Sequence, residues 1–164
     1  MSVNNYRPHI LILPEDDANR QLAIGFILNI DNINIRQVQV LPVSGGWRHV
    51  CDEFVSDYIG AMYTYTNRFM VLLIDFDNKL DRINDVQKVI PSGLSDRVFV
   101  LGTLTEPEEL KRQIVSPYEA IGEALADDFQ NGTHTLLSHE LLKHNQAELD
   151  RLRKNACSKV GKPI

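Results

Sequence analysis

The sequence has few cysteines and lacks any spacing typical of a zinc site. Cys51 and Cys157 are the only two, and they lie far apart in the chain. Neither belongs to a CxxC pair or a Cys/His cluster, so we expect neither a disulfide framework nor a zinc module. His139 and His144 do not have the HExxH spacing of a zinc protease. The cysteine pattern favours a reduced, intracellular protein.

Long hydrophobic runs and an excess of positive charge are also absent. No stretch approaches the roughly 20 apolar residues that a membrane-spanning helix requires. The N-terminal segment MSVNNYRPHILILPEDD does not have the pattern of a signal peptide. A net charge of −5 gives no general attraction to nucleic acid, although local basic patches can still bind phosphates. We therefore expect a soluble, cytoplasmic protein without membrane contact.

The size and composition are those of a globular domain. The chain has 164 residues, of which 43% are hydrophobic and 24% are charged. A chain of this length can bury a core large enough to fold without disulfides or a structural metal. We predict one domain over residues 1–164, with a core at about 8–110 and a C-terminal helical extension at about 111–158.

Strand-like and helix-like patterns alternate along the chain. Four apolar segments are typical of strands, at residues 9–13, 35–43, 69–74 and 98–101. Helical spacing follows each of the first three and dominates after residue 105, including an amphipathic helix predicted over 136–154. This order predicts an α/β fold: a mostly parallel four-stranded sheet with helices on both faces and C-terminal helices.

Carboxylates follow two of the predicted strands. Glu15 comes after the first, and Asp75 and Asp77 come after the third, which is the most apolar. Parallel strands that are neighbours end at the same edge, and residues i and i+2 of an extended segment point the same way. The three carboxylates are therefore predicted to bind Mg²⁺ or Mn²⁺. The alternative is that these acids only solvate turns or cap helices.

A glycine turn precedes the second helix. Ser44, Gly45 and Gly46 lie between a predicted strand and a predicted helix, where backbone N–H groups can bind a phosphate. The turn lacks the GK[ST] ending of a P-loop, and a purely structural role is the alternative. We take these three residues as candidate ligands of a phosphate-bearing cofactor or substrate.

Together these segments resemble the Toprim catalytic domain of topoisomerases, primases and old-type nucleases, and most of all small stand-alone bacterial Toprim-like proteins. The matching segments are ILILPEDD, VSGGW and VLLIDFD, within residues 8–110. The resemblance implies that Glu15 acts as general acid or base. It also implies that Asp75 and Asp77 hold Mg²⁺ for phosphodiester transfer on nucleic acid, as in a nuclease.

The sequence departs from the Toprim pattern at two points. Asp16 stands where the family usually has a glycine, and no tyrosine domain or zinc module is present, so topoisomerase or primase activity would need a partner protein. Nuclease-like relatives carry extra acids after the fourth strand, where this chain has Glu106, Glu108 and Glu109. An acidic first turn of an ordinary helix is the alternative for these three acids.

Two other hypotheses remain open. One is a non-catalytic module of the same fold that binds a nucleotide or a partner protein at the same edge. The other is a receiver-like domain, because ILILPEDDANRQLAIGFIL resembles the acidic pair and first helix of response regulators. Asp75 would then be the phosphoacceptor and Thr103 the switch hydroxyl. No fifth strand ending in lysine is apparent, which opposes this hypothesis.

Overall fold

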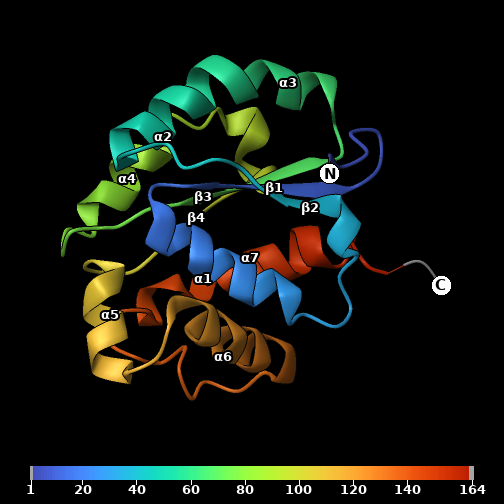
Figure 1. Cartoon of the computed structure of the whole chain (residues 1–164). Coiled ribbons are helices and arrows are strands. Elements are labelled where there is room, and N and C mark those ends of the chain that lie inside the picture. The colour runs from blue at the N-terminus through green and yellow to red at the C-terminus, as the bar shows by residue number, and fades with distance from the viewer. Residues whose placement is uncertain (1, 163–164) are drawn as a thin grey trace.

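A parallel four-stranded sheet forms the centre of the computed structural model, which describes residues 2–162 (Figure 1). Its strands are β1 (His9–Pro14), β2 (Val38–Val40), β3 (Arg68–Leu73) and β4 (Val98–Leu101). They lie in the order β2-β1-β3-β4, and all neighbouring pairs are parallel. The predicted α/β fold is confirmed. β1 and β3 end side by side, at the point where the strand order reverses.

Helices cover both faces of the sheet (Figure 1). One face carries α2 (Trp47–Glu53), a π-helical turn (Phe54–Tyr58), α3 (Ile59–Thr64) and α4 (Asp81–Gln87). The other face carries α1 (Asp17–Leu28) and α7 (Gln146–Leu152), which continues as a second π-helical turn (Arg153–Cys157). Beyond α1 lie α5 (Pro107–Ile114) and α6 (Tyr118–Asn131). Short 3-10 turns complete the fold: Ile35–Gln37, Ser92–Arg97 and Lys143–Asn145.

Each face of the sheet has its own hydrophobic core, because successive strand side chains point to opposite faces. Met70 and Leu72 of β3 pack with residues of the α2–α3 segment. Phe69 and Val71 pack with residues of α6 and α7. β3 is thus buried on both faces, which explains its unbroken apolar sequence.

Two glycines allow α1 and α6 to cross at close range. A Cβ atom on Gly25 would lie 2.1 Å from the carbonyl oxygen of Glu119. A Cβ atom on Gly122 would lie 2.2 Å from the carbonyl oxygen of Leu22. Any larger residue would push the helices apart, so these glycines help to fix α1, whose first turn reaches the carboxyl end of β1.

The second strand is shorter than the sequence pattern predicts. Residues 35–37 form a 3-10 turn, and only Val38–Val40 pairs with β1. The side chain of Asn34 accepts a hydrogen bond from the N–H of Arg36, and its carbonyl accepts one from Gln37 at 2.8 Å. These local bonds compete with ladder pairing, so the strand begins late.

The prediction of one helix over 136–154 is wrong for its first half. Residues 136–142 form turns, and α7 begins only at Gln146. The carboxylate of Asp128 accepts hydrogen bonds from the N–H groups of Leu136 and Leu137, at 2.6 and 3.0 Å. The carbonyl of Leu141 accepts from the N–H of Leu104 at 2.9 Å. These tertiary bonds replace the helical bonds that leucine spacing alone would favour.

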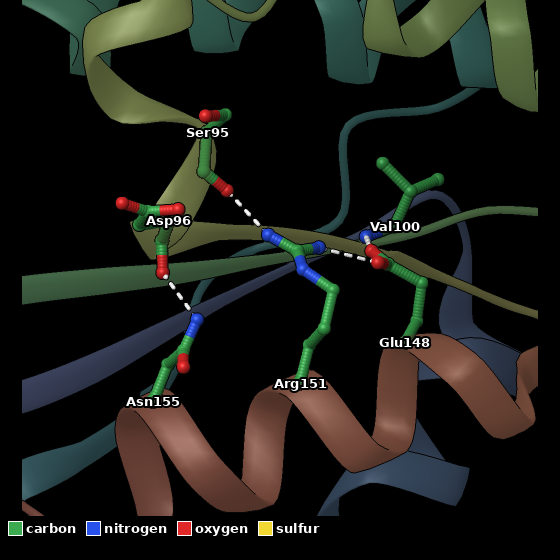
Figure 2. Close-up of polar contacts among 6 residues, drawn as sticks. All are labelled: Ser95, Asp96, Val100, Glu148, Arg151 and Asn155. Atoms are coloured by element: carbon green, nitrogen blue, oxygen red, sulfur yellow. Dashed lines mark hydrogen bonds and ion pairs between the residues drawn. The ribbon is translucent and has the colours of Figure 1, made fainter.

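The α7 segment covers the outer edge of β4 (Figure 2). The carboxylate of Glu148 accepts a hydrogen bond from the N–H of Val100 at 2.8 Å. The amide of Asn145 pairs with both the N–H and the carbonyl of Gly102, at 3.1 and 2.8 Å. Side chains therefore bond the edge groups that a further strand would otherwise bond. The same segment bonds the 3-10 turn before β4, from Arg151 to the Ser95 carbonyl and from Asn155 to the Asp96 carbonyl.

Within residues 2–162, no helix has both the length and the apolar character needed to cross a bilayer.

Candidate functional site

Glu15 and Asp75 meet at the carboxyl ends of β1 and β3. The strand ladder ends with the N–H of Glu15 donating to the carbonyl of Leu73 at 2.9 Å. Asp75 lies two residues beyond the end of β3, and its N–H donates instead to Oε2 of Glu15 at 2.7 Å. The Glu15 side chain thus continues the pairing of the two strands. The structure brings these two predicted site residues together at the position where ligands collect in such sheets.

Asp16 joins this pair through a buried asparagine. Asp16 is the N-cap of α1, and its Oδ1 accepts the N–H of Asn19 at 2.9 Å. The side-chain Nδ2 of Asn19 donates to Oδ1 of Asp16 at 3.0 Å and to Oδ1 of Asp75 at 2.9 Å. Both carboxylates therefore face one amide nitrogen. Asn19 itself is fully buried.

The protonation of Asp75 and Glu15 is perturbed. Burial is the main cause that raises the pKa of Asp75 to about 7, opposed by the hydrogen bond from Asn19 and reinforced by the charges of Glu15, Asp16 and Glu108. Burial also raises the pKa of Glu15, although the N–H of Asp75 opposes the rise. Neighbouring carboxylates make Asp75 and Glu15 harder to ionise, and a bound cation would relieve that repulsion.

Asp77 lies apart from the other acids. Its backbone has φ of 49°, and Asn78 follows with φ of 55°, so the chain leaves the extended conformation there. The Asp77 side chain is 64% exposed and its carboxylate lies 3.7 Å from the guanidinium of Arg82. It also lines a separate surface hollow of about 380 Å³ with Glu106, Glu109 and other residues. The structure does not bring Asp77 beside Glu15 and Asp75.

Arg82 links the site to an aromatic side chain. Its Nη1 donates to the carbonyl of Asp75 at 2.8 Å, and its guanidinium lies 4.7 Å from the ring centroid of Trp47. The guanidinium of Arg48 lies 5.4 Å from the same ring centroid. Arg82 therefore borders the acids, and Trp47, at the start of α2, lies against both Arg82 and Arg48.

The glycine turn is built into the same edge. The N–H of Ser44 donates to the carbonyl of Pro14 at 3.0 Å, and that of Gly45 donates to the carbonyl of Glu15 at 2.9 Å. Gly45 and Gly46 have φ of 90° and 147°, which side chains disfavour. The turn leads from β2 into α2, and these two hydrogen bonds hold it against the end of β1. The N–H groups of Ser44 and Gly45 already have backbone acceptors, for which a phosphate would have to compete. A phosphate-binding role for Ser44, Gly45 and Gly46 stays a prediction.

Sequence analysis missed Asn19 and did not assign Asp16 to the site. The D-x-x-N spacing at the start of α1 is a signal of an N-cap, and it could have indicated that Asn19 lies over the strand ends. Only the packing of α1 on the sheet shows that the Asn19 amide reaches Asp75. Of the three acids after β4, Glu108 is near enough to raise the pKa of Asp75.

The donor set suits a hard cation, although no complete cage is present. Within residues 2–162, no three side chains from His, Cys, Asp and Glu form a group that could hold a metal by themselves. Mg²⁺ usually keeps several waters and takes only one or two protein carboxylates, with substrate phosphate completing its shell. The hydrogen bonds of Asp16 and Asp75 to Asn19 use one oxygen of each carboxylate, which leaves the second oxygen of each for a cation.

Comparison of this chain with protein-family models, with curated proteins and with solved structures found no match. The Toprim resemblance of the three short segments therefore stays a prediction, and the geometry of the site is the basis for a functional proposal.

Proposed function

We propose that the edge formed by Glu15, Asp16 and Asp75 binds Mg²⁺ or Mn²⁺ and carries out phosphoryl transfer on nucleic acid, as in a nuclease. The observation that carries this proposal is the single Asn19 nitrogen that bonds both Asp16 and Asp75, next to Glu15. Three acids from two neighbouring strands thereby share one partly buried place. Asp77, which the sequence pattern assigned to the metal, has a peripheral role in this proposal.

The residues would divide the chemistry as follows. Asp75 and Asp16 would hold the cation, and Glu15 would be the general acid or base, because burial raises its pKa above the ordinary value. A bound Mg²⁺ would neutralise phosphate charge and orient the phosphoryl group. Asn19 would fix the two aspartates relative to each other, which limits the motion of the ligands.

The neighbours of the acids support a nucleic-acid substrate. Arg82, which bonds the carbonyl of Asp75, lies against Trp47, and so does Arg48. Arginines suit backbone phosphates, and an aromatic ring can stack on a base. The net charge of −5 gives no general attraction, so binding would depend on this local group.

Metal titration tests the proposal most directly. We expect calorimetry to detect binding of Mn²⁺ to the wild type at pH 8. Because the cation must displace the proton of Asp75, the affinity should fall by up to about tenfold per pH unit below pH 7. Asp75→Asn should weaken binding at least tenfold. Single- and double-stranded DNA and RNA would then be tested for Mg²⁺-dependent cleavage by the same proteins.

Asp17→Asn is the matched control. Asp17 follows Asp16 directly, but its carboxylate is exposed and bonds Arg20 and Gln21, so its loss should leave Mn²⁺ binding unchanged. A wild type that gives no heat with millimolar Mn²⁺ would contradict the proposal. So would equal losses of affinity in Asp17→Asn and Asp75→Asn.

A phosphoacceptor role for Asp75 is the second candidate. The observation in its favour is that Asp16, one of the receiver-like acidic pair, faces Asp75 across Asn19. The four-stranded sheet of the described residues has α7 beside β4, and no fifth strand supplies a lysine there. Incubation with acetyl phosphate and Mg²⁺, followed by mass spectrometry, discriminates the two. A phosphorylated Asp75 without nucleic-acid cleavage would favour this second function.

A further inference from the structure

An apolar cavity lies between the sheet and the helices of the α1–α7 face. Its volume is about 140 Å³. Its walls are side chains of β1, β3, β4, α1 and α7, among them Ile12, Val71, Ala23 and Leu149. Protein interiors seldom leave a void of this size, because the lining atoms lose contacts across it. The space is similar to an engineered cavity of about 150 Å³ that binds benzene.

The cavity has a polar end near the acids. Asn19, Thr103 and Asn145 contribute to its lining there. The hydroxyl of Thr103 donates to the carbonyl of Thr105 at 2.7 Å, and the amide of Asn145 bonds the backbone of Gly102 at both ends. The Oδ1 of Asn19 is buried and accepts no hydrogen bond within the described residues. Asn19 thus brings an unused acceptor to a lining that is mostly apolar.

A buried acceptor without a donor is costly, and this one persists in a side chain that is fully buried. A single water would be held poorly, because ordered internal waters typically bond two to four polar partners. Here Asn19 Oδ1 is the unused partner among the side-chain amides and hydroxyls of the lining. An apolar molecule with one donor would satisfy the acceptor and fill the void together.

We infer that this cavity binds a small neutral molecule with an apolar body, about the size of a single aromatic ring, and one hydrogen-bond donor that reaches Oδ1 of Asn19. The other end of the same amide donates to Asp16 and Asp75. The ligand would therefore contact the opposite end of the group that fixes the two aspartates. The inference does not depend on metal binding or on phosphoryl transfer.

Phenol and benzene are a matched pair of probes, because they differ by one hydroxyl. Titration of wild-type protein with each, in the absence of divalent metal, should show phenol binding about five- to tenfold more tightly. Methyl NMR should show shifts for Ile12, Val71 and Leu149, which line the cavity. Val86 and Leu94, in the core of the other face, should not shift and serve as internal controls.

Two variants test separately the contribution of the cavity space and that of the Asn19 acceptor to binding. Ala23→Leu should fill the space and reduce binding of both probes at least tenfold. Asn19→Leu should remove the preference for phenol while retaining benzene. Equal affinities of the wild type for the two probes, shifts spread over both cores, or the absence of binding would overturn the inference. The wild-type titration gives this decision even if a variant does not fold.

Discussion

The two ends of the sheet both bury charged groups, but they satisfy them differently. At the amino ends, the Arg97 guanidinium donates to the carbonyls of Met62, Tyr65 and Arg68, at 3.0, 3.3 and 3.1 Å. The Arg68 side chain, only 6% exposed, donates to Nε2 of the buried His9 at 2.9 Å. At the carboxyl ends, by contrast, Asp16 and Asp75 bond one amide, and burial together with the neighbouring acids raises the pKa of Asp75.

This difference indicates that the arginines at the amino ends have a structural role, whereas the acids at the carboxyl ends form a candidate functional site. The arginines have neutral acceptors whose geometry is complete within the protein, so nothing further is needed to stabilise them. The acids repel one another, and their charged state would be stabilised by a cation from outside. Buried charge alone therefore does not indicate a site, whereas uncompensated like charge at a strand switch point does.

The largest expected effect on stability concerns Arg97, at the amino ends of the strands. Arg97→Ala removes a donor from three carbonyls at the junction of α3 and β3, so we expect it to lower the free energy of unfolding by about 3 kcal/mol. Equilibrium urea unfolding at neutral pH measures this change. Mn²⁺ binding of the folded fraction should remain, because the site lies at the opposite end.

Arg97→Lys and Arg7→Ala are controls for this effect. Lysine keeps the charge but has one nitrogen, so it cannot reach all three carbonyls and should lose an intermediate amount. Arg7 is exposed, and its replacement should change stability by less than about 0.5 kcal/mol. If Arg97→Ala unfolds like the wild type, the three hydrogen bonds of Arg97 do not stabilise the fold.

A smaller effect of opposite sign is expected for Asp75→Asn. The pKa of Asp75 is about 7 in the folded protein and ordinarily 3.8, so the wild type loses stability as the pH rises through this interval. Asparagine carries no charge. Without divalent metal, the variant should be more stable than the wild type at pH 8, by on the order of 1–2 kcal/mol after allowance for partial solvation, and about equal at pH 4.

Asp77→Asn is the matched control, because its carboxylate is 64% exposed and lies 3.7 Å from Arg82. Its stability should differ from the wild type by less than about 0.5 kcal/mol at both pH values. Urea unfolding at pH 4 and pH 8 measures both variants. A destabilised Asp75→Asn at pH 8 would mean that the charged carboxylate stabilises the fold, as the arginines do.

The strands and the edge were predictable from the sequence because they depend on local composition. The segments HILIL and FMVLLI are apolar without interruption, which is typical of strands buried on both faces. Neighbouring parallel strands end at one edge, so the approach of Glu15 and Asp75 followed from the order of elements.

The geometry of the candidate site and the turns at 136–142 depend on side-chain contacts that the hydrophobic pattern does not show. The left-handed backbone at Asp77 accompanies the contact of its side chain with Arg82, 3.7 Å away. The bridge from Asn19 to Asp75 exists because α1 packs on the sheet at a particular angle. The turns at 136–142 replace a predicted helix because Asp128, far along α6, bonds their N–H groups. Of these contacts, the one from Asn19 to Asp75 joins residues 56 positions apart, and the other two join residues less than ten positions apart through side-chain contacts that hydrophobic spacing does not show.

The smallest expected effect is on the pH dependence of stability, which His9 and Asp75 change in opposite directions at the two ends of the sheet. His9 accepts from Arg68, and its Nδ1 lies 2.7 Å from the carbonyl of Arg7, an arrangement that fits the neutral imidazole. Burial lowers its pKa, and Arg68 adds to this. Its contribution to stability is therefore present above the ordinary pKa of 6.5 and is lost as the pH falls toward the folded pKa, which is the opposite sign to Asp75.

The test of this opposite sign uses His9→Gln, compared in an Asp75→Asn background that removes the opposing carboxyl. Between pH 6.5 and 5.5, the protein with His9 should lose about 1 kcal/mol at most relative to His9→Gln, as measured by urea unfolding. His49→Gln is the control, because His49 is exposed and contacts only the carbonyl of Ser44, so it should give no such difference. A His9 difference that stays constant with pH would mean that folding does not shift the pKa of His9. His9, at the amino ends of the strands, would then contribute no pH dependence of stability opposite in sign to that of Asp75.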